Sequence, residues 1–273
     1  MKNIRLIVSD LDGTLLSPDH QITDSVWRAV RAFTEAGGWF TIATGRTGVS
    51  VRQTVERLNI DLPMILCNGS ILADKGKIWE QAELSTGGLI PYLQEADRQG
   101  LSAVVFQESG LSAISRTQDI ARFEQRENVD CRLADLTEEQ WAVGHAHKVL
   151  IIGDMNKALT LWEAYSPDLP NAYSTVQSEV DFFEILPANQ SKGRALIQLT
   201  NLLGIELSEV MAIGNQMNDL DMLEQAGIGV AVANSHPELA AKADYVCSGS
   251  FGEGVVEAMK VFCADRMKGY EEE

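Results

Sequence analysis

Paired cysteines, long apolar runs and basic residues are all scarce in this 273-residue sequence. The four cysteines are widely spaced and form no Cys-x-x-Cys pair, which argues against a disulfide framework or a zinc knuckle. No apolar run reaches the roughly 18 residues of a membrane span, and the N-terminal apolar run is far shorter than that of a signal peptide. The sequence therefore predicts a cytoplasmic protein.

The shortage of basic residues leaves a large negative charge. There are 22 Lys and Arg residues against 39 Asp and Glu residues, so the formal net charge is -17. Because this charge repels nucleic acids and anionic membranes at long range, we expect neither as a partner. A small anionic substrate would need a few local cations or backbone N–H groups to hold it. The oligomeric state is not indicated by the sequence.

Strand-like and helix-like segments alternate in the first and last parts of the chain. "IRLIV" precedes the amphipathic "DSVWRAVRAFTEAGG", and "WFTIATG" precedes "VSVRQTVERLN". The same alternation resumes after Ser191 with "SKGRALIQLTNLLG" and "EVMAIG". This order is typical of an α/β fold with a doubly wound parallel sheet.

The middle of the chain has a different pattern. From about Leu84 to Leu186 the segments are more polar and less regular, with helices expected near 86–99, 117–126 and 155–164 among short strands. We therefore expect a discontinuous core of residues 1–83 and 187–273, interrupted by an inserted α+β domain of residues 84–186.

Two carboxylates, Asp10 and Asp12, follow the first strand in "DLDGT". Ligands of open α/β sheets bind beyond the carboxyl ends of the strands, and residues two apart in extended backbone point to the same side. Asp10 and Asp12 can thus face one reacting centre, where one carboxylate attacks phosphorus and the other transfers a proton. The alternative is an ordinary acidic turn, since Asp and Gly are common turn residues.

Candidate phosphate ligands follow two later apolar segments. Thr44 and Gly45 of "TGR" offer a hydroxyl and a backbone N–H, and Arg46 either reaches the same anion or lies exposed on the surface. Lys192 lies in the first turn of the helix that begins at "SKGRAL", with Ser191 as its expected N-cap. A lysine there opposes the helix dipole, so it either has an anion nearby or is a solvated surface residue.

The turn "GNQMND" supplies Asn215, Asn218 and Asp219 after another strand. Together with Asp10 and Asp12, its oxygen atoms suit Mg²⁺, which prefers carboxylates, carbonyls and water. An acidic start of the following helix is the simpler interpretation.

Taken in order, "DLDGTLL", "TGR", "SKGRAL" and "GNQMND" resemble the four motifs of the haloacid dehalogenase superfamily, and are most similar to its Cof-type phosphatases. The similarity extends to "CNGS" and to "GVAVANSHPELAAKADYV", so it covers nearly the whole chain. It implies a Mg²⁺-dependent phosphatase for a small phosphorylated metabolite, by default a sugar phosphate, in which residues 84–186 form an α/β cap domain.

The resemblance also implies roles for individual residues. Asp10 would be the nucleophile that forms an aspartyl-phosphate, and Asp12 would be the general acid and base. Thr44, Gly45 and Lys192 would hold the phosphate, together with Arg46 and Asn218. The metal would be held by Asp10, the backbone carbonyl of Asp12 and the motif-four residues Asn215 and Asp219.

Asn215 is a departure, because the family usually has Asp at this position. An amide oxygen can coordinate Mg²⁺ but brings no charge, so we expect weaker metal binding or a larger share for Asp219. Two other functions stay open. One is a phosphomutase or phosphotransferase with the same nucleophile, and the other is a catalytically impaired regulator that binds a phosphorylated ligand.

Overall fold

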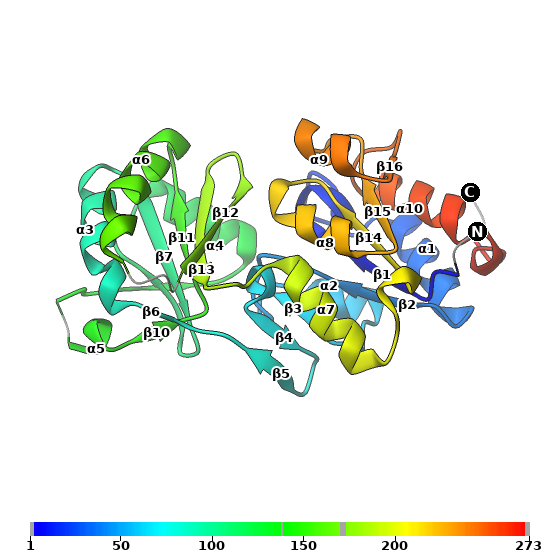
Figure 1. The fold of residues 1–273 in the computed structure, drawn as a ribbon, viewed down its shortest axis with the longest axis horizontal. Helices are drawn as coiled ribbons and strands as arrows, with labels where there is room; N and C mark the ends of the chain where they lie inside the picture. The colour runs from blue at the N-terminus through cyan, green and yellow to red at the C-terminus, as the bar shows by residue number, and fades with distance from the viewer. Residues whose placement is uncertain (1–2, 138, 170–172, 271–273) are drawn as a thin grey trace. The chain divides into compact units, whose positions relative to one another are not determined.

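The computed structural model describes residues 3–137, 139–169 and 173–270 (Figure 1). The chain divides into two compact units, which we call the core unit (Met1–Glu80 and Ser191–Glu273) and the inserted unit (Gln81–Gln190). The sequence predicts boundaries after residues 83 and 186, whereas the units divide after Glu80 and Gln190. The second boundary lies later because the last strand of the inserted unit continues to Pro187.

The core unit is built on a parallel five-stranded sheet in the order β16-β15-β14-β1-β2. Its strands are β1 (Leu6–Ser9), β2 (Trp39–Ile42), β14 (Val210–Gly214), β15 (Ile228–Ala231) and β16 (Tyr245–Val246). A three-stranded sheet of β3 (Met64–Leu66), β4 (Ile71–Ala73) and β5 (Ile78–Gln81) follows in the chain. Ala43 pairs in parallel with Ile65, which joins β3 to the edge of the larger sheet.

Helices cover both faces of the parallel sheet. On one face lie α1 (Asp24–Glu35), α2 (Arg52–Leu58) and α10 (Phe251–Phe262), and on the other α7 (Lys192–Leu203), α8 (Leu220–Gln225) and α9 (Pro237–Lys242). The alternation of β1 fits these two layers, because Ile7 packs in the first group while Leu6 and Val8 pack in the second. The doubly wound fold predicted from the sequence is confirmed.

The sheet order brings two distant loops together. From β1 the chain proceeds outward through β2, and it later returns on the other side of β1 with β14. The carboxyl ends of β1 and β14 are therefore neighbours at the point where the winding direction reverses, and the backbone N–H of Asp10 donates to the carbonyl of Ile213 at 2.9 Å. Such a switch point is the usual place for a ligand in an open α/β sheet.

The inserted unit is an α+β unit with a six-stranded sheet in the order β12-β13-β11-β7-β8-β9. Its strands are β7 (Ser102–Gln107), β8 (Gly110–Ala113), β9 (Cys131–Leu133), β11 (Lys148–Ile152), β12 (Tyr173–Glu179) and β13 (Phe182–Pro187), with β6 (Leu84–Ser85) and β10 (His145–Ala146) as a separate pair. Its helices are α3 (Ile90–Arg98), α4 (Gln118–Glu127), α5 (Glu139–Ala142) and α6 (Met155–Tyr165). Side chains of α3 and α6 pack with Val105 and Val149, whereas those of α4 pack with Val104 and Leu150, so α4 covers the opposite face.

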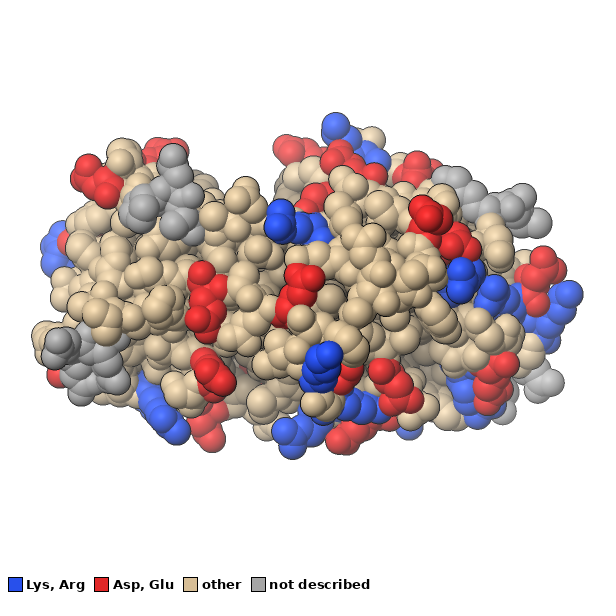
Figure 2. Space-filling view, turned by 60° about the horizontal axis from the view of Figure 1, so that its bottom comes forward, with Lys and Arg blue, Asp and Glu red and all other residues tan. Residues whose placement is uncertain are grey.

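Charge and hydropathy of the described residues agree with this architecture. On the face shown in Figure 2, acidic and basic side chains are interspersed, and neither sign forms a continuous patch among the residues drawn in colour. None of the helices in the described ranges combines the length and the hydropathy that a bilayer span requires.

Glu257 of α10 ties the segment after β16 to this helix. Its carboxylate accepts hydrogen bonds from the Tyr245 hydroxyl (2.8 Å), the Ser248 hydroxyl (2.7 Å) and the backbone N–H groups of Ser248 and Gly249 (3.0 and 2.9 Å). Burial by itself would raise the pKa of Glu257, but these donors outweigh it and lower the pKa from 4.5 to about 2.

We expect Glu257→Gln to destabilise the protein at neutral pH by about 1 kcal/mol, because a neutral amide accepts these hydrogen bonds less strongly. A carboxylate with a lowered folded-state pKa stabilises the fold above its ordinary pKa, and this contribution disappears as the pH falls from 4.5 to about 2. Urea unfolding across this range should show the wild-type advantage shrinking. Glu56→Gln, on the exposed side of α2, is the matched control. A pH-independent difference would contradict the role given to the charge.

Candidate active site

The loop after β1 folds into a tight turn that depends on one glycine. Leu11–Leu15 form a π-helical turn closed by the Leu16 N–H donating to the Leu11 carbonyl at 3.0 Å. Gly13 has φ +80°, a conformation that disfavours side chains, and a Cβ at this position would collide with the Asn215 amide. The glycine of "DLDGT" therefore lets the loops after β1 and β14 approach each other.

A buried lysine joins two buried carboxylates beside this turn. Lys192 Nζ donates to Asp10 Oδ1 at 2.6 Å and to Asp219 Oδ1 at 2.7 Å. Ser191 caps α7 by accepting from the Arg194 N–H, as predicted, and thereby fixes the turn that carries Lys192. The exposed fractions of Lys192, Asp10 and Asp219 are 1%, 5% and 0%. The interpretation of Lys192 as a solvated surface residue is wrong, because it lies between the two anions.

The charges of this cluster change the pKa values of Asp10 and Lys192. Burial and the Asp219 charge raise the pKa of Asp10 to about 7, while Lys192 opposes the rise. Burial alone would lower the pKa of Lys192, but Asp10 and Asp219 outweigh it and raise this pKa above its ordinary value. Lys192 thus carries the positive charge that lets the carboxylates share a buried site.

Asp219 organises the loop after β14. Its Oδ2 accepts from the backbone N–H groups of Asn215 (2.9 Å) and Gln216 (3.0 Å), and its Oδ1 accepts from Lys192. The sequence predicts Asp219 as a metal ligand. In the structure, however, both of its oxygens already have donors, and it positions Lys192 and the backbone of Asn215.

Asn215 lies where a metal was predicted. One atom of its amide is 3.2 Å from Asp10 Oδ2, 3.1 Å from the Asp12 carbonyl oxygen and 3.0 Å from Thr14 Oγ1. Ligands of octahedral Mg²⁺ at 2.0–2.1 Å are separated by about 3.0 Å along an edge, so the first two distances suit a shared cation when the amide oxygen points inward. Among the described residues no cluster of three His, Cys, Asp or Glu side chains is placed to hold a metal. A cation here would therefore need the Asp12 carbonyl and the Asn215 amide oxygen in addition to the Asp10 carboxylate.

Asp12 and Asp10 have different surroundings. Arg46 binds the Asp12 carboxylate through two hydrogen bonds, from Nε at 2.8 Å and from a terminal nitrogen at 2.6 Å, and His20 Nδ1 lies 3.3 Å from the same carboxylate. The side chain of Asp12 is 21% exposed, so this carboxylate is more accessible than that of Asp10. The sequence predicts Arg46 as a phosphate ligand or a surface residue. In the structure it is a bidentate partner of Asp12, and its side chain is only 9% exposed.

Thr44 and Gly45 follow β2 beside Arg46. The Thr44 hydroxyl accepts from the Arg46 N–H at 3.1 Å, and the Thr44 carbonyl accepts from the Asn68 N–H at 3.0 Å. Thr44 is fully buried and Gly45 is partly exposed. Thr44 is thus hydrogen-bonded to the turn that contains Asn68.

Asn68 is a candidate that the sequence analysis did not assign. It follows β3 with φ +54° and is 1% exposed. Its Oδ1 accepts from Asn218 Nδ2 at 3.1 Å, whereas Asn68 Nδ2 and Asn218 Oδ1 have no hydrogen-bond partner among the described residues. The next residue, Gly69, packs against the carbonyl of Ser191, so this turn supports the start of α7. The signal was present in "CNGS", but an Asn-Gly pair is also an ordinary turn.

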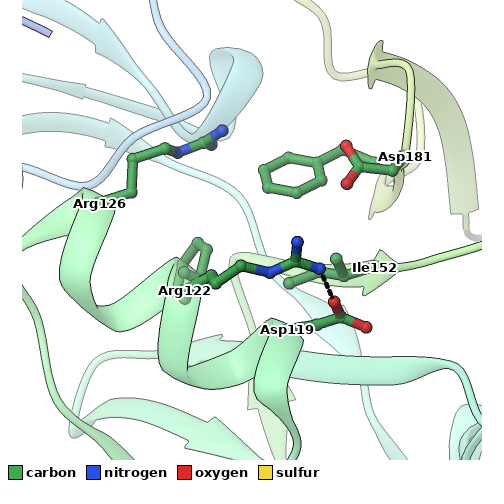
Figure 3. Close-up of a pocket in the computed structure, with 7 residues that line it drawn as sticks. Asp119, Arg122, Arg126, Ile152 and Asp181 are labelled. Atoms are coloured by element: carbon green, nitrogen blue, oxygen red, sulfur yellow. Dashed lines mark hydrogen bonds and ion pairs between the residues drawn. The ribbon is translucent and has the colours of Figure 1, made fainter. Parts of the chain in front are cut away.

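The inserted unit has a pocket of its own, about 220 Å³ in volume, between α4 and the ends of β11 and β13 (Figure 3). Arg122 and Arg126 project from α4 toward it, and Asp181 lies opposite. Arg122 donates to Asp119, and Arg126 binds Glu179 through two hydrogen bonds at 2.8 and 2.9 Å. The pocket contains none of the residues predicted from the motifs, and its arginines are engaged by acidic side chains of the same unit.

Comparisons with known proteins identify the family of this chain. The model of the haloacid dehalogenase-like hydrolases matches residues 7–259. The protein YxeH of Bacillus subtilis is 31% identical over 265 residues, which span 93% of this chain and 97% of that protein. An HMP-PP phosphatase of Cronobacter sakazakii is 30% identical over 244 residues, 87% of each chain.

Solved structures give the same result for the fold. A haloacid dehalogenase-like hydrolase from B. subtilis superposes with a TM-score of 0.83 at 25% identity and covers 95% of this chain and 100% of its own. The subclass IIB sugar phosphatase BT4131 superposes with a TM-score of 0.83 at 21% identity, over 95% and 99% of the two chains, which shows a shared fold. This chain is an enzyme that belongs to the haloacid dehalogenase-like hydrolase family, and the similar proteins carry the names of phosphatases.

Proposed function

We propose that this enzyme is a Mg²⁺-dependent phosphatase that hydrolyses a small phosphorylated metabolite through an aspartyl-phosphate on Asp10. The observation that carries the proposal is that the two oxygens of the Asp10 carboxylate have different contacts. One oxygen is bound by the buried Lys192, and the other lies 3.2 Å from the Asn215 amide atom that also lies 3.1 Å from the Asp12 carbonyl oxygen. A carboxylate held in this way is fixed in position at the switch point of the sheet.

In the first step an Asp10 oxygen forms a bond to the phosphorus, and the bond between phosphorus and the leaving oxygen breaks. Asp12 donates a proton to that leaving oxygen, so the dephosphorylated product departs neutral. In the second step water attacks the phosphorus while the Asp12 carboxylate accepts its proton, and the bond between phosphorus and the Asp10 oxygen breaks. This releases phosphate and restores the Asp10 carboxylate and the protonated Asp12. The bidentate contact with Arg46 orients the Asp12 carboxylate. Because Arg46 binds both oxygens, one of these contacts would have to open when Asp12 carries the proton.

The transferred phosphoryl group needs positive charge and hydrogen-bond donors, because the protein as a whole is strongly anionic. Lys192 supplies the charge, and Thr44, Gly45 and Asn218 supply polar groups, to which we add the unpartnered Nδ2 of Asn68. Mg²⁺, held by Asp10, the carbonyl of Asp12 and the Asn215 oxygen, would reduce the repulsion between the Asp10 carboxylate and the phosphate.

The substrate class follows from the relatives only in outline. HMP-PP phosphatases and a sugar phosphatase are among the similar proteins, which supports a small phosphorylated metabolite. A sugar phosphate is our first choice, and the inserted unit, predicted as a cap, would supply the side chains that select it.

The test is release of inorganic phosphate from p-nitrophenyl phosphate and from a panel of phosphorylated metabolites. We expect turnover with Mg²⁺ and a loss of at least about 100-fold after chelation with EDTA, since the cation offsets charge in the transition state. Restoring excess Mg²⁺ should restore the rate, and an unchanged rate in EDTA would contradict the metal requirement.

Two outcomes would favour the other candidates. Transfer of the phosphoryl group to a sugar hydroxyl in place of water would identify a phosphotransferase or phosphomutase. No turnover at saturating Mg²⁺, together with binding of a phosphorylated ligand, would favour the regulatory protein suggested by Asn215.

A further inference from the structure

The Asn215 amide meets the other oxygens of the site at hydrogen-bond distance. Its inward atom lies 3.2 Å from Asp10 Oδ2 and 3.1 Å from the Asp12 carbonyl oxygen. An oxygen at this point accepts a hydrogen bond from the Thr14 hydroxyl at 3.0 Å, but it also faces two acceptors with no proton between them, which is unfavourable unless a cation lies among the three atoms. A nitrogen at the same point donates hydrogen bonds to these acceptors. The identity of the inward atom therefore depends on whether a cation is present.

The backbone of Asn215 is fixed on both sides. Its N–H donates to Asp219 Oδ2 at 2.9 Å, and its carbonyl accepts from the His236 N–H at 2.8 Å. Exchange of the inward atom thus requires only a half turn of the terminal amide, with no movement of the loop. The buried site can change from one state to the other locally.

The charge balance of the neighbours favours a donor when no metal is bound. Lys192 is shared between Asp10 and Asp219, so the three buried side chains carry one net negative charge when both carboxylates are ionised. Asp10 Oδ1 receives the lysine, which leaves Oδ2 facing Asn215. An amide nitrogen satisfies this oxygen, whereas a carboxylate at position 215 would add a second negative charge there.

We propose that the Asn215 amide nitrogen takes the place of the cation in the metal-free enzyme, and that the amide rotates by half a turn to present its oxygen when Mg²⁺ binds. This role rests on the proposed function. The hydrogen bonds from the amide nitrogen stabilise the metal-free site. They also weaken metal binding, because Mg²⁺ must replace the amide hydrogen bonds and gains a neutral ligand in return.

Calorimetric titration with Mg²⁺ alone tests whether the amide weakens Mg²⁺ binding. We expect Asn215→Asp to bind Mg²⁺ about tenfold more tightly than the wild type, since it adds a charged ligand and removes the competing donor. Asn156→Asp, exposed at the start of α6, adds the same charge in the inserted unit and should leave the affinity unchanged. Equal affinity of the wild type and Asn215→Asp would overturn the proposal.

Thermal unfolding in EDTA tests the metal-free state. We expect Asn215→Asp to melt about 2–4 °C below the wild type in EDTA. When Mg²⁺ is added, the melting temperature of the variant should rise by more than that of the wild type. A variant that melts at or above the wild-type temperature in EDTA would overturn the proposal, because the amide would then stabilise nothing there.

Nuclear magnetic resonance follows the amide itself. The side-chain NH₂ signals of ¹⁵N-labelled protein that vanish in Asn215→Asp are assigned to Asn215. Without metal they should exchange slowly with solvent, and Mg²⁺ should shift them and speed their exchange. Mg²⁺ binding that leaves these signals unchanged would overturn the proposal. None of the three measurements uses catalytic turnover. An inactive enzyme with these properties would therefore contradict the proposed function but still support the rotation of the Asn215 amide.

Discussion

Asp10→Asn is expected to abolish phosphate release, with a fall in kcat of about 10⁴-fold or more. An amide is a very weak nucleophile, so the covalent step on this residue should stop. The fold should survive, because an amide oxygen can still accept a hydrogen bond from Lys192 and Asp219 still partners that lysine. Steady-state hydrolysis of p-nitrophenyl phosphate measures the change.

Asp19→Asn is the matched control for this variant. Asp19 lies exposed in the same N-terminal segment, outside the site, and its replacement should leave the rate within about twofold. If Asp10→Asn keeps a tenth or more of the wild-type activity, Asp10 is not the nucleophile.

Lys192→Met is expected to cost about 3–5 kcal/mol of unfolding free energy, the largest stability effect that we predict. The methionine fills much of the space of the lysine stem but leaves Asp10 and Asp219 facing each other without a cation, and both are almost completely buried. Urea unfolding measured by circular dichroism gives the difference. Lys157→Met, at an exposed position of α6, should change the stability by less than about 0.5 kcal/mol.

A double variant separates charge from packing. Adding Asp219→Asn to Lys192→Met removes one of the two stranded charges and keeps an amide oxygen for the N–H groups of Asn215 and Gln216. It should recover a substantial part of the lost stability. If the double variant is less stable than Lys192→Met by the full effect of Asp219→Asn alone, then the lysine acts through packing.

The sequence predicts the core unit well because its elements are defined by local patterns. The apolar spacing of α1 and the capped start of α7 at Ser191 are properties of short segments, and both helices occur as expected. Motif order then places Asp10, Lys192 and Asn215 at neighbouring strand and helix ends. A single sequence could not show that Lys192 reaches Asp10 across 182 residues, or that it is shared with Asp219.

The pairing of side chains across loops was the least predictable part. Arg46 binds Asp12 although the two residues are 34 positions apart in the sequence, and the residues next to them in the chain do not indicate the contact. The sequence around Asn68 indicates only a turn. The contact of Asn68 with Asn218 could not be predicted, because it depends on the packing of Gly69 against the start of α7. In the inserted unit, short strands such as β8 and β9 carry too few residues to show a period.

The central claim is that phosphate passes through Asp10, and the most direct test is to trap the intermediate. Enzyme turning over a phosphorylated substrate is quenched with borohydride, which reduces an acyl-phosphate to an alcohol, and the modified residue is located by mass spectrometry. We predict homoserine at position 10 in the wild type and none in Asp10→Asn. Phosphate release with no modification at position 10, or with modification at another carboxylate, would contradict the claim.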